Sequence, residues 1–356
     1  MKKIFNTKLL VIVLLSSIIF SVACKKEAVV GGTASSSPKV DSISPGAAAS
    51  NSVITLMGSG LGNIQSIVFD SGKVNAVFNP VFNTDNTIIF RIPVEAIPAK
   101  QNIIFTNSLG VKISVPFQVL GLPTITDVSN FNWSTEYSQI TLAGKNLDDV
   151  YRVAFTTGTD TAIIVSKTKS SLVLKMPTTS VPRSMLNISN LAGTITTTQE
   201  FVNLDNAYKI FTDGYGAGFE NASWGPADLS TTVFKTGTKS FAATYNKGNW
   251  SADGFASWST GVPNMPEYKS LNFWVKGGSI DYTLYITGDK RAGGYGNSDQ
   301  TVPIVVPASV WTYFKIPLEK LELWKTGTPF KQLGWWIKGP DGQNETFYFD
   351  DVIFVK

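Results

Sequence analysis

The sequence has 356 residues, of which 43% are hydrophobic and 16% charged, and its formal net charge is +4. A charge this small, without a clustered basic stretch, argues against nucleic-acid binding. The chain contains no histidine, which excludes Ser-His-Asp and Cys-His catalysis and every histidine-containing metal site. Its length exceeds that of a usual single domain, so we expect two or three domains.

The N-terminal segment, residues 1–23, has the pattern of a secretory signal peptide. A lysine-rich start precedes an apolar stretch from Leu9 to Phe20, which is too short for a lasting transmembrane helix. The letters SVAC end at Cys24, the only cysteine. They resemble a lipobox, which implies that Cys24 is acylated and holds the chain in the outer membrane, facing the cell surface. An ordinary cleavage site with a cysteine nearby is the alternative.

Removal of residues 1–23 takes away three lysines and no acidic residue, which lowers the formal charge from +4 to +1. Residues 24–37 are rich in Gly, Ser, Ala and Thr and have little apolar surface to bury. We therefore expect a flexible tether before the first domain.

The next two segments, residues 38–120 and 122–204, repeat one plan. The first contains SVITLMGSGL and the second SQITLAGKNL, each followed by a short strand pattern with a central phenylalanine. Alternating apolar residues predict a strand with one core face. Gly58 and Gly60 then permit a sharp change of backbone direction, and Asn146 replaces Gly60 in the second copy because Asn tolerates the left-handed region.

These motifs resemble IPT/TIG domains, which implies two immunoglobulin-like β-sandwiches. Such domains are scaffolds in themselves, and in exported proteins tandem copies commonly act as spacers. The fold therefore assigns no function to either repeat.

The third segment, residues 205–356, holds eight of the nine tryptophans. Its closely spaced strand patterns, such as SLNFWVKG, YTLYITG, LGWWIKG and ETFYFDDVIFVK, predict a β-jelly roll and an all-β chain. The order of these strands resembles carbohydrate-binding modules of the galactose-binding-like type. Together with the lipobox and the two repeats, the chain resembles surface glycan-binding proteins of Bacteroidetes polysaccharide-utilisation systems.

This resemblance implies non-catalytic binding of a polysaccharide such as xyloglucan or another β-glucan or hemicellulose. It implies an outer-membrane glycan transporter as a neighbour, and it implies no required cofactor. Two alternatives stay open. One is a glycoside hydrolase or lyase with an unrecognised carboxylate pair, and the other is an adhesin whose aromatic residues bind a protein.

Period-two alternation assigns a direction to the aromatic side chains of the third segment. In LGWWIKG, Trp335 shares the apolar face and is a core residue, whereas Trp336 and Lys338 point outward. In YTLYITG, Tyr285 points outward, and in SLNFWVKG so does Trp274.

The resemblance places YTLYITG and LGWWIKG in the ligand-facing sheet and SLNFWVKG beside the last strand in the opposite sheet. It therefore implies a binding site made by Tyr285, Trp336 and Lys338, with Trp250 and Trp258 at the rim. A flat aromatic ring stacks on the C–H face of a sugar, and polar neighbours bond its hydroxyls. For any one tryptophan, however, core packing is as good an interpretation as sugar contact.

Two aspartates resemble positions at which related modules hold a structural calcium ion. These are Asp213 and Asp350, whose oxygen ligands suit that ion. A solvated strand residue is the alternative for Asp350.

Overall fold

The computed structural model describes residues 31–248, 250–296 and 300–356, apart from the side chain of Lys338. Strands dominate these residues, which confirms the all-β prediction. In the described part of the chain no helix is long and apolar enough to span a membrane. The chain divides into two compact units, Met1–Gly121 and Leu122–Lys356. Cys24 lies outside the described residues.

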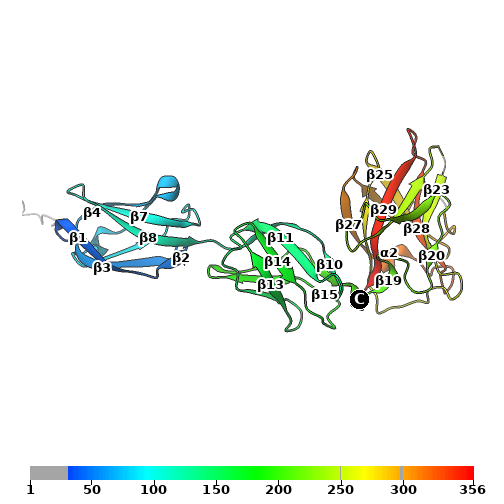
Figure 1. Cartoon of the computed structure of the whole chain (residues 1–356), viewed down its shortest axis with the longest axis horizontal. Coiled ribbons are helices and arrows are strands. Elements are labelled where there is room, and N and C mark those ends of the chain that lie inside the picture. Colours follow the sequence, from blue (N-terminus) through cyan, green and yellow to red (C-terminus); the bar gives the residue numbers. More distant parts are fainter. Residues whose placement is uncertain (1–30, 249, 297–299) are drawn as a thin grey trace, which may run out of the picture. The chain divides into compact units, whose positions relative to one another are not determined.

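The first unit is a β-sandwich whose two sheets have the strand orders β1-β3-β6 and β2-β8-β7-β4-β5. Its strands are β1 (Ala34–Ser44), β2 (Ala47–Ala49), β3 (Val53–Leu61), β4 (Ile64–Phe69), β5 (Val74–Ala76), β6 (Thr87–Arg91), β7 (Lys100–Asn107) and β8 (Lys112–Leu120) (Figure 1). Alternate residues of β3, β6 and β7 fill the core, as the period-two pattern predicts. Phe69, Phe90 and Phe105 meet there edge to face.

The glycine motif in β3 has a counterpart in the second repeat. Gly60 has a φ of 68° and Asn146 a φ of 56°, so both residues take the left-handed conformation predicted from the sequence. Gly58 and Gly144 are needed for space, because a Cβ on either would collide with the carbonyl oxygen of the neighbouring strand, that of Lys39 or Thr124. The motif therefore performs the same local task in both copies.

The second unit begins with another sandwich, whose buried core includes Trp133, Phe155 and Phe201. Its sheets have the orders β17-β16-β12-β13-β14-β11-β9 and β10-β18-β15. The strands are β9 (Thr124–Val128), β10 (Asn132–Trp133), β11 (Gln139–Lys145), β12 (Arg152–Phe155), β13 (Thr161–Lys167), β14 (Ser171–Lys175), β15 (Arg183–Ser184), β16 (Leu186–Asn190), β17 (Gly193–Thr196) and β18 (Phe201–Asn203).

The C-terminal domain packs two antiparallel sheets face to face. One has the order β21-β22-β29-β24-β27, with β19 added on β29, and the other has the order β20-β23-β28-β25-β26. The elements are β19 (Tyr208–Phe211), β20 (Glu220–Asn221), β21 (Ala227–Ser230), β22 (Ser240–Tyr245), β23 (Trp250–Ala256), β24 (Ser270–Lys276), β25 (Tyr282–Gly288), β26 (Pro303–Val306), β27 (Trp311–Pro317), α2 (Leu318–Leu321), β28 (Gln332–Lys338) and β29 (Glu345–Val355).

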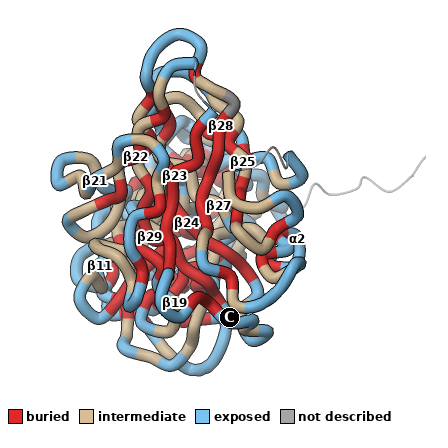
Figure 2. The backbone as a smooth tube through the Cα atoms, turned by 90° about the vertical axis from the view of Figure 1, so that its right-hand side faces the viewer, coloured by how far each residue is buried: buried red, intermediate tan, exposed pale blue. Residues whose placement is uncertain are grey.

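Strand pairing in this domain follows the sequence prediction. YTLYITG (β25) lies beside LGWWIKG (β28), and SLNFWVKG (β24) pairs with the last strand, β29, in the other sheet. Between the sheets Trp335 stacks on Phe349 and is fully buried, which confirms it as a core residue. Figure 2 shows β23, β24, β28 and β29 as the most deeply buried strands.

The second sandwich covers the outward face of β24 and β27 within the same compact unit. Phe131 packs against Trp274 and Tyr313, with ring centroids 5.0 and 5.3 Å away. The Trp274 indole N–H donates to the side chain of Asn130, and the Tyr313 hydroxyl donates to that of Asn132. The outward tryptophan of β24 is therefore only 4% exposed, because another domain covers it.

Candidate functional site

Three aromatic rings lie side by side on the outward face of β23, β28 and β25. Trp336 is opposite Ala252 of β23 on one side and Tyr285 of β25 on the other. The Trp250 and Trp336 rings are stacked 5.2 Å apart at 9°, and the Trp336 and Tyr285 rings 4.7 Å apart at 25°. We call Trp250, Trp336 and Tyr285 the aromatic row.

The middle ring of the row is not the solvent-exposed one. Trp336 points outward, as predicted, yet it is only 1% exposed because a ring stacks on each of its faces. Trp250 is 48% exposed. The sequence interpretation of Trp336 as the ring that meets a ligand face-on is therefore wrong in this arrangement, and Trp250 offers that surface instead.

A further exposed tryptophan, Trp224, lies on the same face, and the sequence analysis missed it. Backbone N–H groups of Ala222 and Trp224 donate to the carbonyls of Gly254 and Ala252, which extends the pairing of β20 along β23. Opposite residues of an antiparallel pair share a face, so Trp224 lies across Ala252 from Trp336. It is 59% exposed. Its segment, NASWGP, has no alternation, so no strand phase could be assigned to it.

The segment around Tyr295 closes the other end of this face. The Tyr295 hydroxyl donates to the Ala222 carbonyl, and its ring meets that of Trp224 edge to face at 5.8 Å. A Cβ on Gly334 of β28 would crowd that hydroxyl, so a glycine is required there. Burial, with a smaller effect of the Asp253 charge, raises the pKa of Tyr295, which keeps it protonated. Tyr295 thus fixes the position of Trp224.

No described side-chain contact joins two of the predicted site residues, Trp258 and Lys338, to the row. Trp258 is 45% exposed but lies beyond the end of β23. It is six residues from Ala252, or roughly 20 Å of extended strand. The backbone of Lys338 pairs with Trp250, while its side chain lies outside the described residues. A ligand role for either stays a prediction.

A groove of about 790 Å³ begins at Tyr285, at the end of the row. We call it the polar groove. It is lined by Ser279, Ile280, Tyr282, Thr283, Tyr285, Ile337, Gly339, Asp341, Gly342, Gln343 and Glu345.

Glu345 lies at the base of the polar groove and is only 3% exposed. It accepts hydrogen bonds from the backbone N–H and hydroxyl of Ser279, from the Tyr282 hydroxyl and from the Gln343 amide. Burial acts to raise the pKa of Glu345, but these hydrogen bonds, with Ser279 foremost, outweigh it and hold the pKa below its ordinary value. The group is therefore an ionised carboxylate that organises the polar side chains around it.

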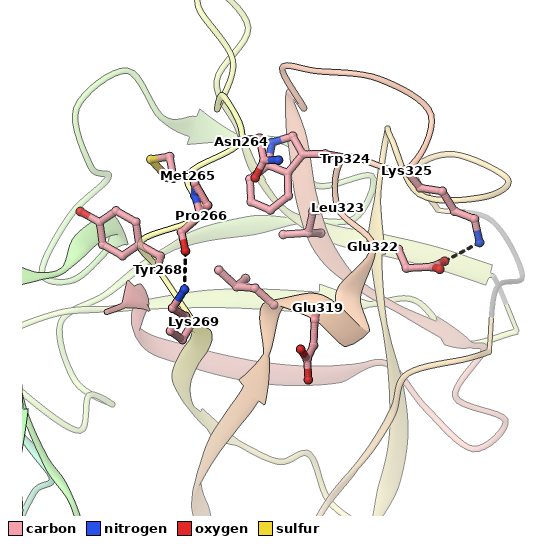
Figure 3. A pocket seen from close by; sticks show the side chains of 11 residues that line it. Asn264, Met265, Pro266, Tyr268, Lys269, Glu319, Glu322, Leu323, Trp324 and Lys325 are labelled. Atoms are coloured by element: carbon pink, nitrogen blue, oxygen red, sulfur yellow. Dashed lines mark hydrogen bonds and ion pairs between the residues drawn. The ribbon is translucent and has the colours of Figure 1, made fainter.

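A second cavity, of about 430 Å³, lies between the segment 264–269 and α2. Figure 3 shows Trp324 beside Asn264, with Glu322 paired to Lys325 on the rim. The Trp324 indole N–H donates to the Val262 carbonyl, and the ring packs on the buried core. This cavity shares no lining residue with the aromatic row, and its tryptophan contributes to core packing.

The two aspartates predicted to hold calcium are engaged by protein donors. Asp213 accepts from the backbone N–H groups of Thr238 and Lys239, and Asp350 from those of Lys235 and Thr236. Within residues 31–248, 250–296 and 300–356, no three acidic, Cys or His side chains gather where a metal ion could bind. N–H donors already point at these carboxylates, and calcium binding by Asp213 and Asp350 stays a prediction.

Asp350 and its neighbour Asp351 form a buried acidic pair near the second sandwich. Burial, and then the charge of Asp351, raises the pKa of Asp350 to about 8. Burial likewise raises the pKa of Asp351 to about 6, although the Asn132 amide donates to it. The folded unit therefore favours protonation of this pair.

Comparison with known proteins supports the fold. Residues 38–119 match the family model of the IPT/TIG domain, which confirms that resemblance for the first repeat. A comparison with curated proteins finds no match.

Among solved structures, the chain is similar to the surface glycan-binding protein PbSGBP-B from Prevotella bryantii, with 18% identity, 90% of this chain and 99% of that chain covered, and a TM-score of 0.42. It is similar to SGBP-B from a complex xyloglucan utilization locus in Bacteroides uniformis, with 18% identity, the same shares covered and a TM-score of 0.41. A family 30 carbohydrate-binding module is 17% identical, with 42% of this chain and 87% of that chain covered and a TM-score of 0.29. These scores lie below 0.5, so the function is argued below from the residues of the site.

Proposed function

We propose that the chain is a non-catalytic polysaccharide-binding protein that holds glycan on the outward face of β23, β28 and β25. The observation that supports this most is the pair of exposed indoles, Trp224 and Trp250, on one sheet face: Trp224 lies across from Ala252, and Trp250 lies two residues along β23 from it. Monomeric proteins rarely expose several tryptophans on one sheet face without a partner that covers them. A sugar ring, with apolar C–H faces and polar edges, fits such a surface.

The two exposed indoles belong to neighbouring segments of one sheet face. Trp224 and Trp336 stand two strand spacings apart, or roughly 10 Å, with Ala252 between them. Trp250 stacks on Trp336 and is diagonal to Trp224 across β23. A sugar that stacks on the exposed part of Trp250 meets a ring that the stack behind it keeps in place at little entropic cost.

We also propose that the protein does not cleave the glycan that it binds. Glycoside hydrolysis needs two carboxylates on opposite sides of the scissile bond. The polar groove is lined by two carboxylates, Asp341 and Glu345. Glu345 is buried under four hydrogen bonds and has a lowered pKa, which suits a structural acceptor and not a proton donor. Incubation with the bound polysaccharide should release no reducing ends, and release at a steady rate would make it an enzyme.

The binding experiment is affinity electrophoresis of the purified chain through gels cast with neutral plant polysaccharides. We expect retardation by a β-glucan or a hemicellulose, and its loss in Trp250→Ala. Phe234→Ala is the control, because Phe234 is an exposed aromatic residue of the same domain, 40% against 48%, but follows β21 of the opposite sheet. Unhindered migration through every gel, or equal loss in both variants, would contradict the proposal.

We further propose that Cys24 carries the lipid that anchors the protein to the outer membrane. The support is the lipobox-like SVAC sequence in residues 21–24 and the position of this cysteine after an apolar stretch. Cys24→Ser should move the protein from the membrane fraction to the soluble fraction while leaving glycan binding unchanged. Digestion by protease added to intact cells would show that the protein faces outward, and protection would place it in the periplasm.

A further inference from the structure

Asp253 is a carboxylate at a position of β23 that faces the core. It lies opposite Trp335 of β28, and opposite residues of an antiparallel pair share a face, so its side chain points between the sheets. It is fully buried. Burial raises the pKa of Asp253 to about 6, although hydrogen-bond donors, with the Gly225 N–H foremost, act to lower it. A charge at such a position lowers stability unless a donor compensates it, so its donor shows what the carboxylate holds in place.

The donor belongs to the segment that carries Trp224. The Gly225 N–H donates to Asp253 Oδ1, with 2.9 Å between the two atoms. A Cβ on Gly225 would come within 2.4 Å of the Thr244 carbonyl oxygen and 3.3 Å of both carboxylate oxygens, so a larger residue would shift the backbone here. The hydrogen bond and the close approach therefore fix the chain at the residue that directly follows the indole.

The bond to Gly225 is made where the segment leaves β23. Before it, the Trp224 N–H donates to the Ala252 carbonyl of β23. After it, the Pro226 carbonyl accepts from the Thr244 N–H, and β21 pairs with β22 in the opposite sheet. The neighbouring strand β20 is only two residues long. Without an anchor at Gly225, Trp224 would sit at the end of a short edge strand, where local opening costs little.

From this geometry we propose that Asp253 is a positioning residue for glycan binding, which acts by holding Trp224 on the outward face and does not touch the sugar. The inference rests on the proposed function and adds to it how one of the exposed indoles is kept in place. Asp253 and Trp224 lie on opposite faces of the sheet, so a ligand stacked on the indole does not reach the buried carboxylate. A charged acceptor suits this task, because it makes a stronger hydrogen bond than a neutral one.

The first test needs no glycan. Hydrogen exchange of the full chain at pH 8, followed by mass spectrometry, reports the protection of the amides in residues 222–225. Asp253→Ala should make them exchange about tenfold faster, while exchange in β24 and β29 stays slow and shows that the domain is folded. Asp253→Asn keeps an acceptor oxygen and should restore slow exchange. Asp228→Ala is the matched control, because Asp228 is an exposed carboxylate farther along the same segment. Equal protection in the wild type and Asp253→Ala would overturn the proposal.

The second test asks whether Asp253 acts through Trp224. In calorimetry with the polysaccharide that retards the wild type, Asp253→Ala should weaken binding about fivefold, less than loss of the indole itself, and Asp253→Asn should bind like the wild type. In a Trp224→Ala background, Asp253→Ala should cause no further loss.

Gly225→Ala displaces the segment from the other side of the hydrogen bond and should follow Asp253→Ala in both backgrounds. A loss that persists without Trp224 would overturn the proposal and leave the proposed function standing. No binding by the wild type would remove the proposed function, and with it this role for Asp253.

Discussion

The two sheets of the C-terminal domain carry similar outward aromatic side chains but use them differently. On β24 and β27, Trp274 and Tyr313 are covered by Phe131 of the second sandwich. On the opposite sheet, Trp224 and Trp250 are 59% and 48% exposed. The same residue type thus joins two domains on one face and faces solvent on the other. A tryptophan that points away from its own core is a surface available to a partner, and only its surroundings decide which partner takes it.

The two faces also differ in the contacts that hold their aromatic side chains. The covered face is crossed by side-chain hydrogen bonds: the Tyr313 hydroxyl accepts from Asn272 and donates to Asn132. The exposed face is held by ring stacking between Trp250, Trp336 and Tyr285. Hydrogen bonds between the side chains of two domains suit a permanent contact, and preorganised rings exposed to solvent suit a ligand that binds reversibly.

The largest expected effect is on the covered face. Trp274→Ala should lower the free energy of unfolding of the second unit by about 3 kcal/mol, because it leaves a cavity beneath Phe131 and removes a buried hydrogen bond. Glycan affinity should stay the same. Urea unfolding followed by circular dichroism measures the first quantity and calorimetry the second. Loss of affinity at wild-type stability would mean that the two faces have been assigned the wrong way round.

On the exposed face, Trp224→Ala should weaken glycan binding about tenfold, or about 1.4 kcal/mol, because one of the two exposed indoles of this face is lost. The free energy of unfolding should fall by less than about 1 kcal/mol, since Trp224 is mostly exposed and its ring contact is with Tyr295 alone among the described rings. Calorimetry with the best polysaccharide from the gel panel is the measurement. Unchanged affinity would restrict the site to the aromatic row.

The buried acidic pair beside the covered face predicts a pH dependence. The pKa values of Asp350 and Asp351 are raised to about 8 and about 6 in the folded unit, above the ordinary value of 3.8. The folded state therefore binds more protons than the unfolded one, and the free energy of unfolding should fall as pH rises from about 4 to about 8.

Asp351→Asn should make the free energy of unfolding fall less steeply with rising pH. At pH 8 it should raise the free energy of unfolding of the second unit by about 1 kcal/mol. Asn suits the backbone at this position, where φ is 47°, and its amide oxygen can keep the hydrogen bond from Asn132. Urea titrations at pH 5 and pH 8 compare the two proteins. An equal change in the free energy of unfolding between pH 5 and pH 8 in the wild type and the variant would show that the pKa values of the pair are not raised in the folded unit.

The smallest expected effect concerns an ion pair between the second sandwich and β27. Lys315 of β27 pairs with Glu200 of the second sandwich, and both side chains are partly exposed. Lys315→Ala should lower the free energy of unfolding of the second unit by about 0.5 kcal/mol or less. The difference from the wild type should vanish in high salt, because salt screens exposed charges. Urea unfolding at low and high salt is the check. A larger, salt-independent loss would mean that the pair holds the two domains together.

Much of the fold and the direction of many side chains could be predicted from the sequence. The alternation in YTLYITG and LGWWIKG placed Trp335 in the core and Tyr285 outward, and the structure has both. The turn in the two repeats followed from Gly60 and from Asn146 in its place. These features are local, because strand alternation and the left-handed region depend only on a few consecutive residues and their stereochemistry.

The candidate site depended on neighbours that are distant in the sequence. Trp336 is buried because rings from two other strands stack on it, and Trp274 because a different domain supplies Phe131. Trp224 lies at the site because its segment pairs with the backbone of β23, and no alternation of apolar and polar residues in that segment predicts the pairing. The sequence by itself determined which way a side chain leaves its strand. Only the tertiary structure decided what meets it there, because the burial of an outward residue is a property of contacts between segments and not of the segment that carries it.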